Sequence, residues 1–189
     1  MFRRLQTWLL LCFGLLAFTP ALADEYSDAA DAFRKASQSA SFFSNAYGYA
    51  VFPTIGKGGI GIGGARGTGH VYAQGWRTGV ATLTQVTLGF QFGGQAYSQI
   101  IFFQDKRAFD EFTSGNFEFA AQASAVAITA GASAAATTTG ASAGASGGRH
   151  DAATTGSYYK GMAVFTVAKG GLMYEAAIGG QKFSYTPRK

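Results

Sequence analysis

The chain of 189 residues has a single cysteine, Cys12, and only two histidines, His70 and His150. A disulfide needs two cysteines, and a zinc site draws three or four ligands from cysteine, histidine and carboxylate side chains. Cys12 lies in an apolar N-terminal run, ahead of the region expected to fold. The sequence therefore predicts a domain without disulfides and without a bound metal.

Charge is also scarce. Charged residues make up 13% of the chain, with a formal net charge of +5. The basic residues are scattered and do not form the stripe that is typical of nucleic-acid-binding proteins. This distribution argues against a nucleic-acid partner and is compatible with weak attraction to an anionic membrane surface.

The chain has no apolar run long enough to cross a bilayer, which takes about 20 residues. Its longest run, residues 8–18, follows a cationic start at residues 1–4 and precedes small residues at 20–23. This order is typical of a secretory signal peptide. We therefore expect residues 1–23 to be removed and the mature protein to begin near Asp24, in the periplasm.

Lipid anchoring through Cys12 is not expected. Lipoprotein processing requires small residues just before the cysteine. In this chain Leu9, Leu10 and Leu11 precede it. The exported protein is therefore expected to lack an acyl anchor, although association with a membrane stays open.

Glycine and aromatic residues are abundant instead. There are 27 glycines against 3 prolines, and aromatic residues make up 15% of the chain. Short alternating segments separated by glycine turns predict a mainly β (α+β) domain over residues 47–189, a small antiparallel sheet of about eight to ten strands curled like a barrel. Spacings of three and four residues predict an amphipathic helix over 24–46. Asp105 is expected to cap one short internal helix that ends at Phe112.

The segment from Gly79 to Phe92 shows the β alternation most clearly. Val80, Thr82, Thr84 and Val86 share one face, and Gln85 lies on the other. Such alternation is typical of a sheet with one buried face. Short strands are also expected at Tyr49–Phe52, ending at Pro53, and at Ile60–Ala65. The basic residues Lys57 and Arg66 then fall at turns.

Two motifs that suggest enzymes lack the required context. Residues 59–64 fit G-x-G-x-x-G, but a further turn follows in place of the helix that a dinucleotide site needs. Ser142 and Ser146 fit G-x-S-x-G within a tract of Gly, Ala, Ser and Thr that provides neither the strand nor the helix of a nucleophile elbow. The chain is therefore expected to be non-catalytic and to use no cofactor.

Three glycine blocks, in order, resemble the SYLF lipid-binding domain family. They are Lys57–Gly64, Gly89–Ser98 and Lys169–Met173. The resemblance extends over Tyr47–Tyr185 and implies a phospholipid-binding module. Eukaryotic members bind phosphoinositides and, in fungi, actin, whereas bacterial members look like envelope proteins. An exported bacterial protein meets neither of those ligands, so actin is not an expected partner.

Lipid contacts in this family are partly ascribed to a basic N-terminal helix. In this chain the helix starts with acidic residues and has only Arg34 and Lys35 as cations. The expected contacts therefore shift to the turns and to an apolar interior. The candidate headgroup residues are Lys57, Arg66, Arg77, Lys169 and Lys182. The candidate residues lining the interior are Phe90, Phe92, Tyr97 and Phe102.

The resulting hypothesis is a non-catalytic periplasmic protein that binds phospholipid or another anionic lipid. The first alternative is a structural protein that maintains the cell envelope through a protein partner and binds no lipid. An outer-membrane barrel and a serine hydrolase around Ser142 or Ser146 are further alternatives.

Overall fold

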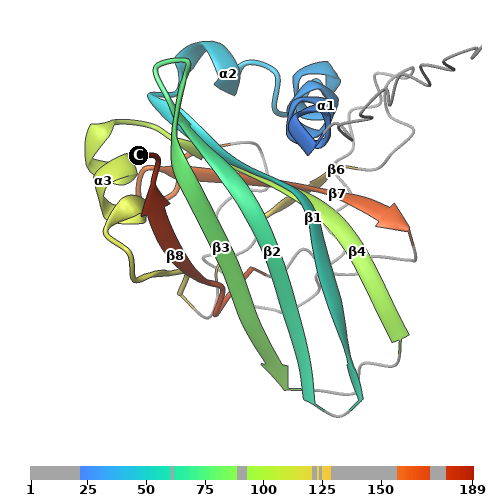
Figure 1. The fold of residues 1–189 in the computed structure, drawn as a ribbon. Coiled ribbons are helices and arrows are strands. Elements are labelled where there is room, and N and C mark those ends of the chain that lie inside the picture. Colours follow the sequence, from blue (N-terminus) through green and yellow to red (C-terminus); the bar gives the residue numbers. More distant parts are fainter. Residues whose placement is uncertain are drawn as a thin grey trace, which may run out of the picture.

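The fold is built on one curled sheet, whose strands lie in the order β5-β8-β3-β2-β1-β4-β7-β6 (Figure 1). The structure is a computed structural model that describes residues 22–60, 62–88, 93–120, 123, 125–128, 157–170 and 178–189. The strands are β1 (Gly48–Ile60), β2 (Ile62–Ala73), β3 (Trp76–Leu88), β4 (Gly93–Phe103), β5 (Phe117–Glu118), β6 (Val126–Ile128), β7 (Met162–Gly170) and β8 (Lys182–Pro187).

The predicted fold class is confirmed. The domain is mainly β, and its eight strands curl into a half-barrel whose edge strands are β5 and β6. Neighbouring strands run antiparallel, apart from the short parallel pair formed by β6 and β7.

The segment predicted as one helix over 24–46 holds two, α1 (Leu22–Lys35) and α2 (Phe42–Asn45). The Ser39 hydroxyl donates to the backbone carbonyl of Phe33 at 2.6 Å. Serine hydroxyls offer the backbone such local partners in place of continued helix, which is why they favour helix ends. The chain therefore turns after Lys35, and α2 starts in a new direction.

The short internal helix is confirmed as α3 (Lys106–Thr113). The Asp105 carboxylate accepts a hydrogen bond from the backbone N–H of Ala108 at 2.8 Å, which satisfies a donor that the first turn leaves free. Phe112 is buried against the inner face of the sheet, where it packs with Phe103 and Phe183.

Strand β1 continues through Pro53, where the sequence predicted an end. The register shifts between Val51 and Ile55 opposite β2 and between Phe52 and Ile55 opposite β4. Pro53 therefore lies in a bulge, where the ladder does not need its missing N–H. The predicted turn at Lys57 is therefore part of a strand. Strand β2 likewise runs without a break through Arg66.

The sheet buries both of its faces. The inner face packs against α3, and the outer face is covered near one end by α1 and α2 (Figure 1). The inner core includes Ala50, Phe52, Ile55, Leu83, Ile101, Phe103, Phe112 and Phe183. The outer core includes Ala29, Ala30, Phe33, Phe42, Val51, Ile100, Phe102 and Phe165.

The buried face of β3 differs from the one that its apolar residues suggest. Ala81, Leu83 and Gln85 are buried on the inner face, whereas Val86 on the outer face is 73% exposed. The reason is that α1 and α2 pack on the other end of the outer face, so nothing among the described residues covers Val86 there.

Glycine on β2 lets the inner core pack closely against the sheet. A Cβ built on Gly69 would lie 2.6 Å from Cδ1 of Phe52, whose ring is fully buried. We predict that Gly69→Ala lowers the free energy of unfolding by about 1–3 kcal/mol through overpacking. Gly56→Ala is the matched control, because a Cβ there meets nothing within 4 Å. Thermal melts of both variants measure the effect, and equal melting temperatures would contradict this packing.

Candidate functional site

Cross-strand pairing brings three of the five candidate basic residues into one band across the sheet. Lys182 on β8 pairs with Thr84, Thr84 with Arg66 on β2, and Arg66 with Gly56 on β1. We call these four residues the basic row. Lys57 follows Gly56 directly. Neighbouring strands lie about 4.8 Å apart, so the row is compact.

The side chains near the row point to different faces. Arg66, Thr84 and Lys182 share the outer face, because directly paired residues project to the same side. Lys57 is half-buried and points to the inner face, where its partner Ala65 belongs to the inner core. Lys182 forms an ion pair with Glu118 at 3.5 Å. Arg66 and Lys57 take part in none of the ion pairs between described residues.

Beyond the basic row only four strands continue among the described residues. Strand β8 begins at the row, and β7 pairs with β4 no further than Gly170 opposite Ala96. Residues 56–60, 62–66, 84–88 and 93–96 form this end of the sheet, which we call the sheet extension (Figure 1). Its sequence contains Lys57 and Arg66 but no Asp or Glu.

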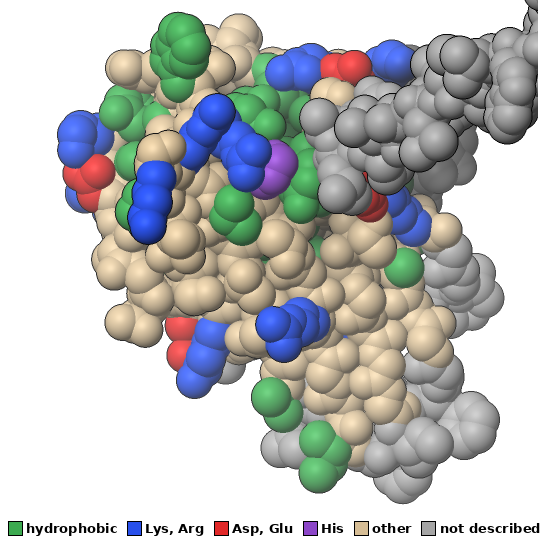
Figure 2. Space-filling model, in the orientation of Figure 1, with side chains coloured by type: hydrophobic (Ala, Val, Ile, Leu, Met, Phe, Trp, Pro, Cys, Tyr) green, Lys and Arg blue, Asp and Glu red, His purple; other side chains and the backbone are tan. Residues whose placement is uncertain are grey.

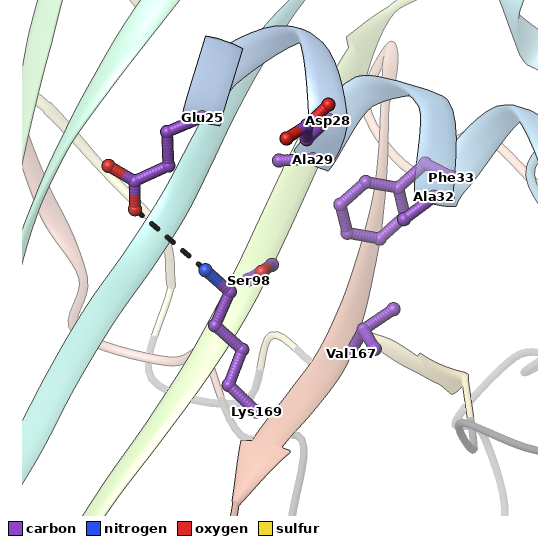
Figure 3. A pocket seen from close by; sticks show the side chains of 8 residues that line it. All are labelled: Glu25, Asp28, Ala29, Ala32, Phe33, Ser98, Val167 and Lys169. Atoms are coloured by element: carbon purple, nitrogen blue, oxygen red, sulfur yellow. Dashed lines mark ion pairs between the residues drawn. The ribbon is translucent and has the colours of Figure 1, made fainter. Parts of the chain in front are cut away.

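Lys169 lies on the outer face but is held by helix α1. Its Nζ lies 3.8 Å from Glu25 Oε1 (Figure 3). The Nζ also donates to Thr54 Oγ1 at 2.9 Å, and the Thr54 hydroxyl donates to Glu25 Oε1 at 2.8 Å. These contacts fasten the start of α1 to β1 and β7. Lys169 is therefore engaged within the fold, whereas Arg66 forms no ion pair with a described residue.

A pocket of about 420 Å³ opens beneath α1, beside Lys169 (Figure 3). Its lining residues are Glu25, Asp28, Ala29, Ala32, Phe33, Ser98, Val167 and Lys169. Glu25 and Asp28 place two carboxylates beside the single cation, so the rim repels anionic headgroups. Ser98 donates its hydroxyl to the Pro53 carbonyl at 2.6 Å and is buried, so it is not poised as a nucleophile.

Arg77 lies at the opposite end of the sheet, at the start of β3. It is half-buried, and its Nε has no hydrogen-bond partner among the described residues. Its charge acts on His70, which lies on the outer face of β2, and on Tyr26, which α1 places over that ring. The five predicted cations therefore do not form one rim.

The predicted aromatic residues do not share one interior. Tyr97 is buried on the inner face, and Phe102 is fully buried on the outer face between Phe42 and Phe165. Phe90 and Phe92 lie outside the described residues, as do Ser142 and Ser146. Tyr97 and Phe102 thus fill two separate cores.

Sequence reasoning missed a buried polar layer on the inner face. The amides of Gln99 and Gln181 exchange two hydrogen bonds of 2.9 and 3.1 Å, and Gln181 also donates to the Tyr97 hydroxyl at 3.2 Å. Burial is the main cause that raises the pKa of Tyr97 to about 12. The signal in the sequence was Gln99, an amide beside the apolar residues of β4.

The family comparison matches residues 84–185 to the model described as Ysc84: Las17-binding protein actin regulator. This match covers more than half of the chain. The chain belongs to the Ysc84 family. This confirms the resemblance to SYLF domains stated from the glycine blocks, of which the first, Lys57–Gly64, precedes the matched range. A search of curated proteins finds no match.

Membership in the Ysc84 family places the chain in a lipid-binding domain family. The Ysc84 or SYLF domain is a lipid-binding domain of a non-enzymatic family. Within the described part of this Ysc84 domain, no three His, Cys, Asp or Glu side chains group as metal ligands. In the same part of the chain, no helix is long and apolar enough to span a membrane.

The Tyr26 ring of this Ysc84 domain stacks on the His70 ring, with centroids 3.4 Å apart and planes 8° from parallel. Burial, followed by the Arg77 charge, lowers the pKa of His70 from 6.5 to about 4. The unfolded chain therefore binds more protons between these pH values, so stability falls as the pH drops from about 6.5 towards 4.

We predict that His70→Phe, which keeps an aromatic ring beneath Tyr26, loses less stability than the parent chain over this pH range. Melting temperatures measured for both proteins at about pH 7 and about pH 4.5 test the difference. Carboxylate titration affects both chains and cancels in the comparison. An equal fall in both would contradict a half-buried, neutral His70.

Proposed function

We propose that this Ysc84 domain is an exported, non-catalytic protein that binds anionic phospholipid at a membrane surface. The observation that carries the proposal is a pair of cations, Arg66 and Lys57, that form no ion pair with any described residue and lie at a sheet extension whose sequence contains no acidic residue. Two of the other candidate cations, Lys169 and Lys182, are already paired with carboxylates.

Electrostatics set the strength of this binding. A basic side chain near an anionic bilayer contributes about 1 kcal/mol, and the effect falls off within a Debye length. Two cations that pair with no described carboxylate therefore support weak, reversible and salt-sensitive attachment. Other apolar or cationic contacts are needed for tighter binding.

Helix α1 is not the proposed lipid contact. Its apolar residues Ala29, Ala30 and Phe33 are buried against the outer face of the sheet, and Glu25 and Asp28 are exposed. A helix that lies in a membrane interface presents a free apolar face together with a basic polar face. Here the apolar face is occupied and the start of the polar face is acidic.

The family description names Las17 binding and actin regulation. Our proposal does not extend these partners to this chain, because an exported protein does not meet actin. The signal-peptide pattern over residues 1–23 supports export, and cleavage there would leave Asp24 and Glu25 in the first turn of α1. Acidic residues at that position stabilise a helix.

Co-sedimentation with vesicles tests headgroup binding. We predict that Lys57→Gln/Arg66→Gln reduces binding to vesicles of phosphatidylglycerol and phosphatidylethanolamine by about tenfold at low salt, because two cations near the surface are lost. Lys106→Gln/Arg107→Gln on α3 is the matched control with the same change of charge. Binding of the parent chain should also weaken as salt rises.

Absence of parent binding to these vesicles, in a sample shown to be folded, would overturn the lipid proposal and favour a protein partner in the envelope. Equal losses in the two double variants would show that net charge alone matters. That result would contradict a localised headgroup site.

Export has its own test. We predict that the full-length chain, produced in a bacterial host, is recovered from the periplasmic fraction without residues 1–23. Intact mass and N-terminal sequencing measure this directly. Recovery of the unprocessed chain from the cytoplasm would contradict the proposed location.

A further inference from the structure

The free end of the sheet extension carries exposed aliphatic side chains. Ile62 on β2 is 67% exposed and Val86 on β3 is 73% exposed. Val86 pairs with Gly64 and Ile62 pairs with Leu88, so the two side chains are diagonal neighbours on the outer face. Figure 2 shows hydrophobic side chains at this lower end of the molecule, below a broad face of backbone and polar groups.

The aliphatic residues lie beyond the basic row along the strands. Val86 is two residues past Thr84, and Ile62 is four residues before Arg66 on the neighbouring antiparallel strand. At about 3.3 Å per residue, they project about 7 and 13 Å past the row. This spacing matches the step from phospholipid headgroups to the start of the acyl chains, since interfacial segments sink about 5–10 Å into that boundary.

Among the described residues, few side chains cover the outer face between these groups. A Cβ on Gly56 would meet nothing within 4 Å, one on Gly64 only the Gln85 carbonyl at 3.5 Å, and one on Gly94 only the Lys57 carbonyl at 4.0 Å. No described side chain therefore stands between the row and a surface that approaches this face. The extension also has no carboxylate that an anionic surface would repel.

We propose that the sheet extension docks end-on into a lipid bilayer, with Ile62 and Val86 in the acyl boundary and Arg66 and Lys57 at headgroup depth. This inference rests on the proposed lipid binding and names the surface that performs it. The bilayer is the chosen occupant because cations and aliphatic side chains follow one another in the order in which a membrane presents phosphates and acyl chains.

The opposite end of the sheet offers a competing surface. Trp76 is 80% exposed there, next to Arg77. However, Arg77 is half-buried against the site of α1 docking, where Glu25, Asp28 and Asp31 add negative charge on the helix. Trp76 therefore provides a matched control for the extension.

Two variants and one label test the docking. Ile62→Ser/Val86→Ser should reduce binding to vesicles of phosphatidylglycerol and phosphatidylethanolamine by about tenfold, because aliphatic area no longer leaves water. Trp76→Ser should bind like the parent. In a Cys12→Ser chain, an environment-sensitive fluorophore on Ile62→Cys should shift to shorter wavelength with vesicles and be quenched by nitroxide lipids, whereas one on Trp76→Cys should not.

The outcomes separate this inference from the proposed function. If the parent chain fails to bind vesicles, the lipid proposal itself fails. If the parent binds while Ile62→Ser/Val86→Ser binds equally well, or the label on Trp76→Cys responds in place of that on Ile62→Cys, the end-on docking is overturned. Circular dichroism of each variant confirms that a loss of binding is not a loss of fold, and the two label sites give a readout that does not depend on altered affinity.

Discussion

The central strands of the sheet have to bury side chains on both faces. On β1, Ala50 and Phe52 pack into the inner core, and Val51 between them packs into the outer core, all three fully buried. Removing the cover from one face would expose large aliphatic and aromatic groups, each worth about 1.5–3 kcal/mol of burial. Helices α1 and α2 provide that cover on the outer face, and α3 packs on the inner face (Figure 1).

This constraint divides the outer face into a part that α1 and α2 cover and a part that no described helix covers. The apolar side of α1 is committed to the sheet, and its Glu25 holds Lys169 and Thr54 in place. The remaining part of the sheet carries glycine, Arg66 and exposed aliphatic side chains. Since the apolar side of α1 is occupied here, the exposed strands become the available surface. Structure and surface chemistry thus support lipid contact by strands.

Sequence patterns were sufficient for the fold class, the Asp105 cap and the family, because alternation, capping and glycine blocks are local signals. The sequence patterns failed where long-range packing determines the structure. Pro53 predicted a strand end, yet a bulge accommodates it within β1. Val86 lies on an exposed face because nothing among the described residues covers that end, and no local pattern reports this. Lys57 and Arg66 were singled out as headgroup candidates at turns, but only the strand register reveals that they lie on opposite faces.

Hydrogen exchange measured by mass spectrometry, with and without anionic vesicles, tests the central claim most directly. The account predicts slower exchange with vesicles in peptides that cover the sheet extension. Peptides from α1 and from the turn at Trp76 should stay unchanged. Faster exchange in α1, or protection confined to it, would mean that the helix leaves the sheet to meet the membrane. That result would contradict a fold in which α1 serves as permanent cover for the outer core.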